Sequence, residues 1–102
     1  MSLKKQYLKS KPVCKVTFNL DRTDTLSAES VHLVGEFNDW DIEAHPMKKL
    51  KNGKFTTTVN LESGKEYQYR YLLNKTEWVN DGNADKYIPT PFGGEDNSVV
   101  IL

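Results

Sequence analysis

Two tryptophans are the residues of this sequence best suited to hold a ligand. Trp40 ends the patterned stretch 31–40, and Trp78 ends the stretch 67–78. Each stands where a predicted strand runs into a loop, and each has polar neighbours. At such a place an indole can offer a flat apolar surface to the C–H face of a pyranose ring. A second interpretation stays open, because tryptophan is highly buried on average and either ring could belong to the core.

Two polar residues could complete such a surface. Arg70 alternates with the tyrosines of 67–71, so it lies on the other face of its strand and could donate several hydrogen bonds to hydroxyl groups. Asn97 precedes the last predicted strand and can both donate and accept. Each also has an ordinary interpretation: Arg70 as a solvated strand residue, and Asn97 as a turn residue.

The patterns that would indicate catalysis or a metal are weak. Cys14 alternates with apolar residues, so a buried and inert thiol is expected. His32 is expected on the surface and His45 in a loop, with no nucleophile near either in the sequence. The acidic residues before His45 fit neither a zinc nor a calcium motif, and no pair of carboxylates across a cleft can be assigned. We therefore expect no catalytic residue, no metal and no cofactor.

The composition is that of a globular chain without net charge. Of the 102 residues, 37% are hydrophobic and 27% are charged, with 14 Lys and Arg against 14 Asp and Glu. This balance argues against nucleic acid or a membrane as the main partner and is compatible with a neutral polymer. No apolar run approaches the roughly 18 residues of a membrane span, and the N-terminus lacks the apolar part of a secretory signal. One cysteine cannot form an internal disulfide, so a cytoplasmic location is expected.

Alternation with a period of two predicts short strands separated by turns. The predicted strands are 13–20, 30–35, 54–61, 67–73, 78–79 and 98–102. Asn52-Gly53 predicts a hairpin, and Met47 and Leu50 are expected to pack on the core. No stretch has sustained helical periodicity. These features predict an all-β fold, an immunoglobulin-like antiparallel β-sandwich, with the tyrosines of 67–71 facing inward.

The chain is expected to divide into a tail and one domain. Residues 1–11 are rich in lysine and unpatterned, which predicts a flexible N-terminal tail. Residues 12–102 then form the β-sandwich domain, which is long enough for a modest core. Loops are expected at 21–30, 80–85 and 87–95. A catalytic (β/α)₈ barrel needs about 250 residues, more than this chain holds.

Seven short segments, taken in order, resemble the family 48 carbohydrate-binding modules. They are VHLVGEFNDW at 31–40, PM at 46–47, GKF at 53–55, LESGKEYQYRY at 61–71, WVND at 78–81, FG at 92–93 and NSVV at 97–100. These modules are also called isoamylase N-terminal or early-set domains. They precede the barrel in family 13 glycogen branching and debranching enzymes, and they form the glycogen-binding domain of the AMP-activated protein kinase β-subunit. The resemblance implies the same sandwich fold and covers about residues 13–102.

The resemblance also implies a set of site residues. Trp40 and Trp78 would stack on an α-1,4-glucan, and Arg70 would bond its hydroxyl groups. A late loop would complete the site through Phe92 and Asn97. Two departures from the pattern are visible: this loop is about one residue longer than in the kinase type and lacks its threonine, and no enzyme barrel follows in this chain.

Two functions are therefore carried forward. The first is non-catalytic binding of a glycogen- or starch-like α-1,4-glucan through an aromatic platform on one face of the sandwich. The alternative is a structural or protein-interaction early-set domain, associated with a family 13 enzyme or another protein, without useful affinity for sugar. Burial of both tryptophans would favour the alternative. In either case Asp81 is expected to be a structural residue of the motif.

Overall fold

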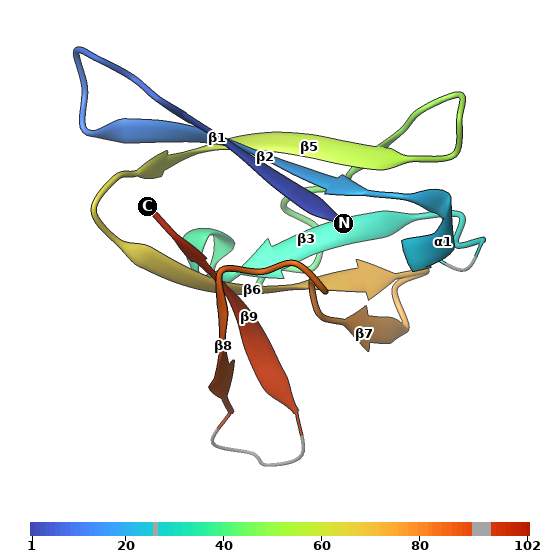
Figure 1. Ribbon diagram of the computed structural model, residues 1–102. Coiled ribbons are helices and arrows are strands. Elements are labelled where there is room, and N and C mark those ends of the chain that lie inside the picture. Colours follow the sequence, from blue (N-terminus) through green and yellow to red (C-terminus); the bar gives the residue numbers. More distant parts are fainter. Residues whose placement is uncertain (26, 91–94) are drawn as a thin grey trace.

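Two antiparallel β-sheets pack face to face in this protein (Figure 1). The computed structural model describes residues 1–25, 27–90 and 95–102. One sheet has the strand order β1-β2-β5-β4, and the other has the order β3-β6-β9-β8 with β7 also paired to β6. The bounds are β1 Ser2–Tyr7, β2 Val13–Leu20, β3 Val31–Gly35, β4 Lys48–Lys49, β5 Phe55–Glu62, β6 Glu66–Leu73, β7 Glu77–Val79, β8 Lys86–Pro89 and β9 Asp96–Ile101. The predicted all-β sandwich is confirmed.

Helical structure in the described residues is limited to two short segments. These are α1 (Arg22–Thr25) and the 3₁₀ turn η1 (Glu36–Asn38). Segment 21–30 was predicted as a polar connection, and α1 forms one turn within it. No helix in the described part of the chain is long and apolar enough to cross a membrane.

The core lies between the two sheets and follows from the alternation of β2 and β6. Phe18 of β2 and Tyr69 of β6 meet edge to face, with ring centroids 5.2 Å apart. Tyr69 and Tyr71 are fully buried, and Tyr67 is partly buried against the same cluster. The inward orientation predicted for the three tyrosines is confirmed. Burying each large side chain contributes about 1.5–3 kcal/mol before the entropy of ordering is subtracted.

The first residues of the chain differ from the tail that the sequence predicted. Ser2–Tyr7 form β1, which pairs with β2 from Ser2↔Asn19 to Tyr7↔Cys14. Leu3 packs against the core, and the side chain of Lys5 makes an ion pair of 2.7 Å with Asp85. The lysines masked this strand in the sequence because they occupy the partly solvated edge of a sheet, where charged residues are common.

Two further segments differ from the sequence predictions. Residues 87–95 were expected to be loop, but Lys86–Pro89 form β8 at the edge of the second sheet, where a proline can end a strand. Leu50 was expected to pack on the core but is 37% exposed. It lies in the hairpin between β4 and β5, outside the alternating pattern of either strand. Met47, in contrast, is buried as predicted.

Candidate functional site

Three of the predicted site residues lie on the face of the second sheet that points away from the core, here called the outer face. Arg70 stands between two buried tyrosines of β6, so its side chain leaves the sheet on the opposite side. Val79 packs against the core, so the neighbouring Trp78 of β7 also points outward. Asn97 of β9 alternates with the fully buried Ser98 and lies on the same face. Strands β7 and β9 both pair with β6 (Figure 1), so the sheet brings Arg70, Trp78 and Asn97 to one surface.

Trp78 is held on this surface by its partner across the strands. Its register partner in β6 is Leu72, which is only 2% exposed although it lies outside the main core cluster. Side chains that are directly opposite in antiparallel strands have Cβ atoms about 4.5–5.5 Å apart, so they pack together. Trp78 itself is 41% exposed. One part of the indole is thus supported by the sheet, and the rest is open to solvent.

Arg70 is fixed in place by Glu95, which precedes β9, and by Asp96, the first residue of β9. Its Nη1 donates to Oε2 of Glu95 over 3.2 Å, and its Nη2 donates to the carbonyl oxygen of Asp96 over 2.9 Å. The side chain of Arg70 is 16% exposed, whereas that of Glu95 is 69% exposed. Its buried Nε has no hydrogen-bond partner among the residues that the structure describes. The guanidinium therefore has an ordered position and unused donor capacity.

Asn97 joins the same surface through a side-chain hydrogen bond. Its Nδ2 donates to Oε1 of Gln68 over 2.9 Å. Gln68 lies two residues before Arg70 in β6, and therefore on the same face of the strand. Asn80 links this region to β7 by donating to the carbonyl oxygen of Asp96 over 2.6 Å. Phe92, the remaining predicted site residue, lies outside the described residues.

Trp40 reaches its position through an uncommon backbone conformation. Asp39 and Trp40 have φ angles of 56° and 57°, both in the left-handed region that residues with a side chain seldom adopt. The amide nitrogen of Trp40 donates to the carbonyl oxygen of Gly35 over 2.9 Å, which closes the loop on the end of β3. Trp40 is 38% exposed. Strained residues of this kind persist where the surrounding structure holds them, and they are frequent at ligand sites.

Asn38 is the residue that holds this loop together. Its Oδ1 accepts from the amide of Gly35 over 3.0 Å, and its Nδ2 donates to the carbonyl oxygen of Leu33 over 3.0 Å. The same Nδ2 is 2.8 Å from Nδ1 of His45. Asn38 therefore ties the end of β3 to the loop that returns from Trp40. Asn38 is not among the site residues predicted from the sequence, although its place between Gly35 and Trp40 was a usable signal.

Gly35 allows the strand to approach its neighbour closely. A Cβ atom at this position would lie 2.5 Å from the carbonyl oxygen of Gln68 and 2.8 Å from Cβ of Tyr69. The requirement is one of space, since the φ of Gly35 is −169° and is ordinary extended backbone. Any larger residue would push β3, and with it the start of the Trp40 loop, away from β6.

His32 was expected on the surface, and that prediction is wrong. Its register partner is Leu72, so His32 lies on the outer face of the sheet. However, His32 is only 7% exposed. It lies between β6 on one side and a bridge to Pro46 on the other. The outer face is therefore partly covered next to the site, which alternation along one strand could not reveal.

The buried acid Asp81 supports the sheet from beneath. Its Oδ2 accepts from the hydroxyl of Tyr69 over 2.8 Å and from that of Tyr71 over 3.3 Å, and its amide donates to Ser98 Oγ over 2.8 Å. Burial raises the pKa of both tyrosines far above the usual value, and the Asp81 carboxylate raises them further. Asp81 is fully buried and has these partners, which fits a structural role.

Other candidates for chemistry do not gather around the tryptophans. Cys14 is a buried free thiol in β2, as the sequence predicted. Within residues 1–25, 27–90 and 95–102, no three His, Cys, Asp or Glu side chains come together in a way that could hold a metal ion. The outer face thus combines an exposed indole with ordered amide and guanidinium groups. Such a surface can hold a polar ring by stacking and hydrogen bonding.

Comparison with known proteins points to one family. Residues 26–93 match the sequence model of the family carbohydrate-binding module 48, the isoamylase N-terminal domain. The chain is 30% identical over 70 residues to an amylopullulanase of Thermoanaerobacter thermohydrosulfuricus, which covers 67% of this chain and 5% of that protein. It is 34% identical over 61 residues to the 1,4-alpha-glucan branching enzyme GlgB of Butyrivibrio fibrisolvens, which covers 60% of this chain and 10% of that enzyme. The matched segment is thus a small part of each relative.

Proposed function

Since the chain belongs to the carbohydrate-binding module 48 family, we propose that it binds α-1,4-glucan of the glycogen or starch type without catalysing any reaction. Trp40 and Trp78 are the proposed stacking platforms. Arg70 and Asn97 are the proposed donors and acceptors for hydroxyl groups, and Phe92 is proposed to add to the surface. The relatives are an amylopullulanase and a branching enzyme, so an α-glucan is the polymer that fits this family context.

The exposure of the two tryptophans is the single observation that carries this proposal. Trp40 and Trp78 are 38% and 41% exposed, whereas the aromatic rings of Tyr69 and Tyr71 are fully buried in the core. Leaving so much indole in water costs free energy that burial would recover. A ligand that covers the exposed surfaces removes this cost. Two buried tryptophans would have supported the structural alternative instead.

Arg70 suits the role of a hydroxyl donor because its present partner is exchangeable. Its ion pair with Glu95 involves a carboxylate that is 69% exposed, and such pairs contribute little to stability. A sugar hydroxyl could replace Glu95 while the bond to the Asp96 carbonyl keeps the guanidinium in place. The ligand would then meet a donor that is already ordered, which lowers the entropy lost on binding.

The expected affinity is modest. Covering one face of an indole contributes about 1–2 kcal/mol, and a few hydroxyl bonds add to this against the cost of immobilising the ligand. We expect a Kd of about 10⁻⁵–10⁻³ M for a short oligosaccharide. A glycogen particle offers many sites, so several copies of the module on one partner would bind it more tightly through avidity.

A titration with maltoheptaose, followed by intrinsic tryptophan fluorescence, tests the proposal. We expect a saturable change in fluorescence with maltoheptaose and none with cellohexaose. The β-linked chain has a different curvature, so its sugar rings would not align with the two tryptophans in the same way. A saturable change with both sugars, or with neither, would contradict α-glucan recognition. Incubation of amylose with the purified chain should release no reducing ends over time, since no acid and nucleophile pair can be assigned.

The alternative is a packing domain that associates with a family 13 enzyme or another protein. It is favoured by the small share of each relative that the matched segment occupies. If maltoheptaose fails to bind, the exposed tryptophans would be explained as contacts to such a protein. A cytoplasmic location is part of the main proposal, because Cys14 is a free thiol and requires no oxidising compartment.

A further inference from the structure

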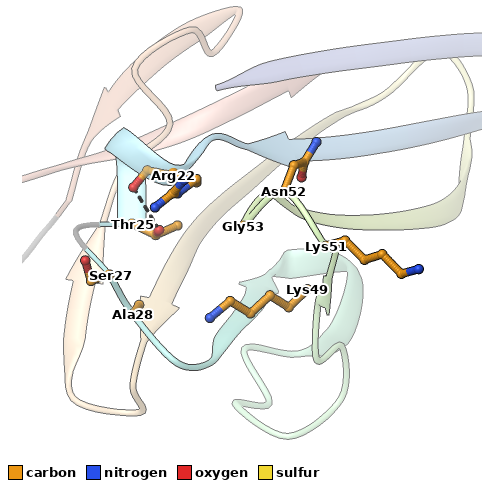
Figure 2. A pocket seen from close by; sticks show the side chains of 8 residues that line it. All are labelled: Arg22, Thr25, Ser27, Ala28, Lys49, Lys51, Asn52 and Gly53. Atoms are coloured by element: carbon orange, nitrogen blue, oxygen red, sulfur yellow. Dashed lines mark hydrogen bonds between the residues drawn. The ribbon is translucent and has the colours of Figure 1, made fainter.

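A basic pocket lies at the end of the sandwich where α1 meets the hairpin between β4 and β5 (Figure 2). It has a volume of about 330 Å³, at the lower end of the range for small-ligand pockets. The lining residues come from α1, the segment after it and the hairpin: Arg22, Thr25, Ser27, Ala28, Lys49, Lys51, Asn52 and Gly53. None of them is a residue of the candidate glucan site.

The charge of this pocket is unbalanced in a chain that is neutral as a whole. Arg22 and Lys49 bring two positive charges to the cavity, while the side chain of Lys51 is turned away from them. No acidic residue is among the lining residues. None of the three forms an ion pair with a carboxylate in the part of the chain that the structure describes. Unpaired cations that face one cavity repel one another, and an anion between them would remove this repulsion.

The two acidic residues that flank Arg22 most closely in the sequence are already engaged elsewhere. Oδ2 of Asp24 lies 2.8 Å from the α-amino group of Met1, and Oδ1 of Asp21 lies 3.6 Å from Nζ of Lys54. Each of these carboxylates therefore has its own cation. The positive charge of Arg22, between Asp21 and Asp24 in the chain, is left to the pocket.

Two of the three cations are held in position by packing. A Cβ atom built on Gly53 would lie 2.5 Å from Cγ and 2.6 Å from Cδ of Arg22, so the stem of Arg22 rests directly on the hairpin backbone. Nζ of Lys49 lies 5.7 Å from the ring centroid of Phe55, a distance typical of a cation–π contact. In Figure 2, Lys49 extends toward Ala28 and Arg22 lies beside Thr25, whereas Lys51 points away from them.

Neutral polar groups lie beside these charges. The Oδ1 of Asn52 accepts from the amide of Lys54 over 3.0 Å, and in Figure 2 its amide nitrogen points away from Arg22 and Lys49. Ser27 supplies a hydroxyl at the rim of the pocket. A guanidinium, an ammonium and a hydroxyl form a set of donors suited to the several oxygens of a phosphate group.

We propose that this pocket binds the phosphate group of a small phosphate monoester, of about the size of a hexose phosphate. Arg22 supplies the planar donor pair, and Lys49 supplies the second charge across the cavity. The volume of the pocket suits one phosphate group with a small organic part, which is the size of a small-molecule ligand and not of a polymer. The proposal rests on a different set of residues from the glucan site, so it stands or falls independently of the proposed function.

Titrations of ¹⁵N-labelled protein, followed by amide chemical shifts at constant ionic strength, test this inference. The probes are inorganic phosphate, glucose 6-phosphate, neutral glucose and sodium chloride. We expect saturable shifts confined to residues 22–28 and 49–53 with both phosphates, and a Kd of about 10⁻⁴–10⁻³ M. Tighter binding of glucose 6-phosphate would identify an organic phosphate as the ligand, and equal binding would identify the phosphate group alone.

Substitutions decide whether the pocket or general basicity is responsible. Lys49→Gln and Arg22→Gln should each weaken phosphate binding about tenfold, as expected for loss of one charge-assisted contact. Lys51→Gln should have a smaller effect, and the matched control Lys15→Gln, on the exposed face of β2, should have none. If Arg22→Gln impairs folding, Lys49→Gln alone decides. Shifts that chloride reproduces, or equal losses in Lys49→Gln and Lys15→Gln, would overturn the proposal.

Discussion

The amide nitrogen of Trp40 donates a hydrogen bond of 2.9 Å to the carbonyl oxygen of Gly35, the last residue of β3. This bond connects an exposed aromatic ring to the regular hydrogen-bonding frame of the sheet. Gly35 is paired with Tyr69 of β6, whose ring is fully buried. The position of Trp40 therefore depends on how closely β3 approaches β6.

Gly35→Ala is predicted to destabilise the protein. The added Cβ would meet the backbone of Gln68, which cannot move aside as a flexible side chain could. We expect the free energy of unfolding in urea to fall by about 1–3 kcal/mol, the usual cost of overpacking. Gly82→Ala is the matched control, because a Cβ at Gly82 would have no neighbour within 4 Å. Equal stability of the two variants would show that β3 can shift without cost.

Asn38→Ala is predicted to loosen the Trp40 loop while leaving Trp78 in place. The substitution removes the side-chain bonds to Gly35 and Leu33. In ¹H–¹⁵N spectra the indole signal of Trp40 should shift or broaden, and that of Trp78 should not. Affinity for maltoheptaose should fall roughly threefold to tenfold, the cost of ordering a mobile side chain on binding. Unchanged indole signals would contradict the role assigned to Asn38.

Stability is predicted to decline in alkali because two buried tyrosines retain their protons in the folded state. Burial beside Asp81 raises the pKa of Tyr69 and Tyr71, whereas a tyrosine in the unfolded chain ionises near pH 10. The stabilisation is therefore complete below about pH 10 and is lost above it, by about 1.4 kcal/mol per pH unit for each tyrosine.

The variant Tyr71→Phe isolates this effect. The free energy of unfolding in urea, measured between pH 9 and pH 11, should decline less steeply for Tyr71→Phe than for the parent. The variant releases one fewer proton on unfolding, which reduces the slope by up to about 1.4 kcal/mol per pH unit. Tyr7→Phe, at an exposed position of β1, should keep the slope of the parent. Parallel declines for the parent and Tyr71→Phe would mean that the buried hydroxyl does not resist ionisation.

Arg70→Ala is predicted to weaken glucan binding less than removal of either tryptophan. Its proposed contribution is a hydrogen bond to hydroxyl groups, for which a charged donor gives about 1.5–3 kcal/mol gross and less when Glu95 must be displaced. We expect a loss of about threefold to tenfold in calorimetric titrations with maltoheptaose. Arg70→Lys should retain part of the binding, since it keeps the charge. A larger loss for Arg70→Ala than for Trp78→Ala would reverse the proposed ranking.

The sequence predicted most of the fold because half-buried strands alternate visibly. Residues 13–20 were predicted as a strand and form β2, since one face meets the core and the other meets water. The hairpin at Asn52-Gly53 was also predicted, and Gly53 adopts a φ of 86° there. β1 was missed because its lysines lie at a sheet edge, and β8 was missed because a short edge strand tolerates polar residues and proline.

The candidate site could be predicted in part. The alternation of β6 placed Arg70 opposite to the tyrosines, and in the structure the register puts it on the same face as Trp78. The left-handed backbone of Asp39 and Trp40 and the burial of His32 could not be predicted. His32 is buried beside Pro46 and β6, which are distant from it in sequence. The left-handed residues follow from the way the loop closes on Gly35. Alternation along one strand carries no information about either feature.

The measurement that tests the central claim most directly is a calorimetric titration of maltoheptaose into the parent protein, Trp40→Ala, Trp78→Ala and Tyr7→Ala. Tyr7 is the matched control, since it is an exposed aromatic residue on the other sheet. We predict that each tryptophan variant remains folded, with a cooperative unfolding transition in urea, and loses binding at least about tenfold. Tyr7→Ala should bind as the parent does. If both folded tryptophan variants bind as tightly as Tyr7→Ala, the aromatic platform is not the binding site.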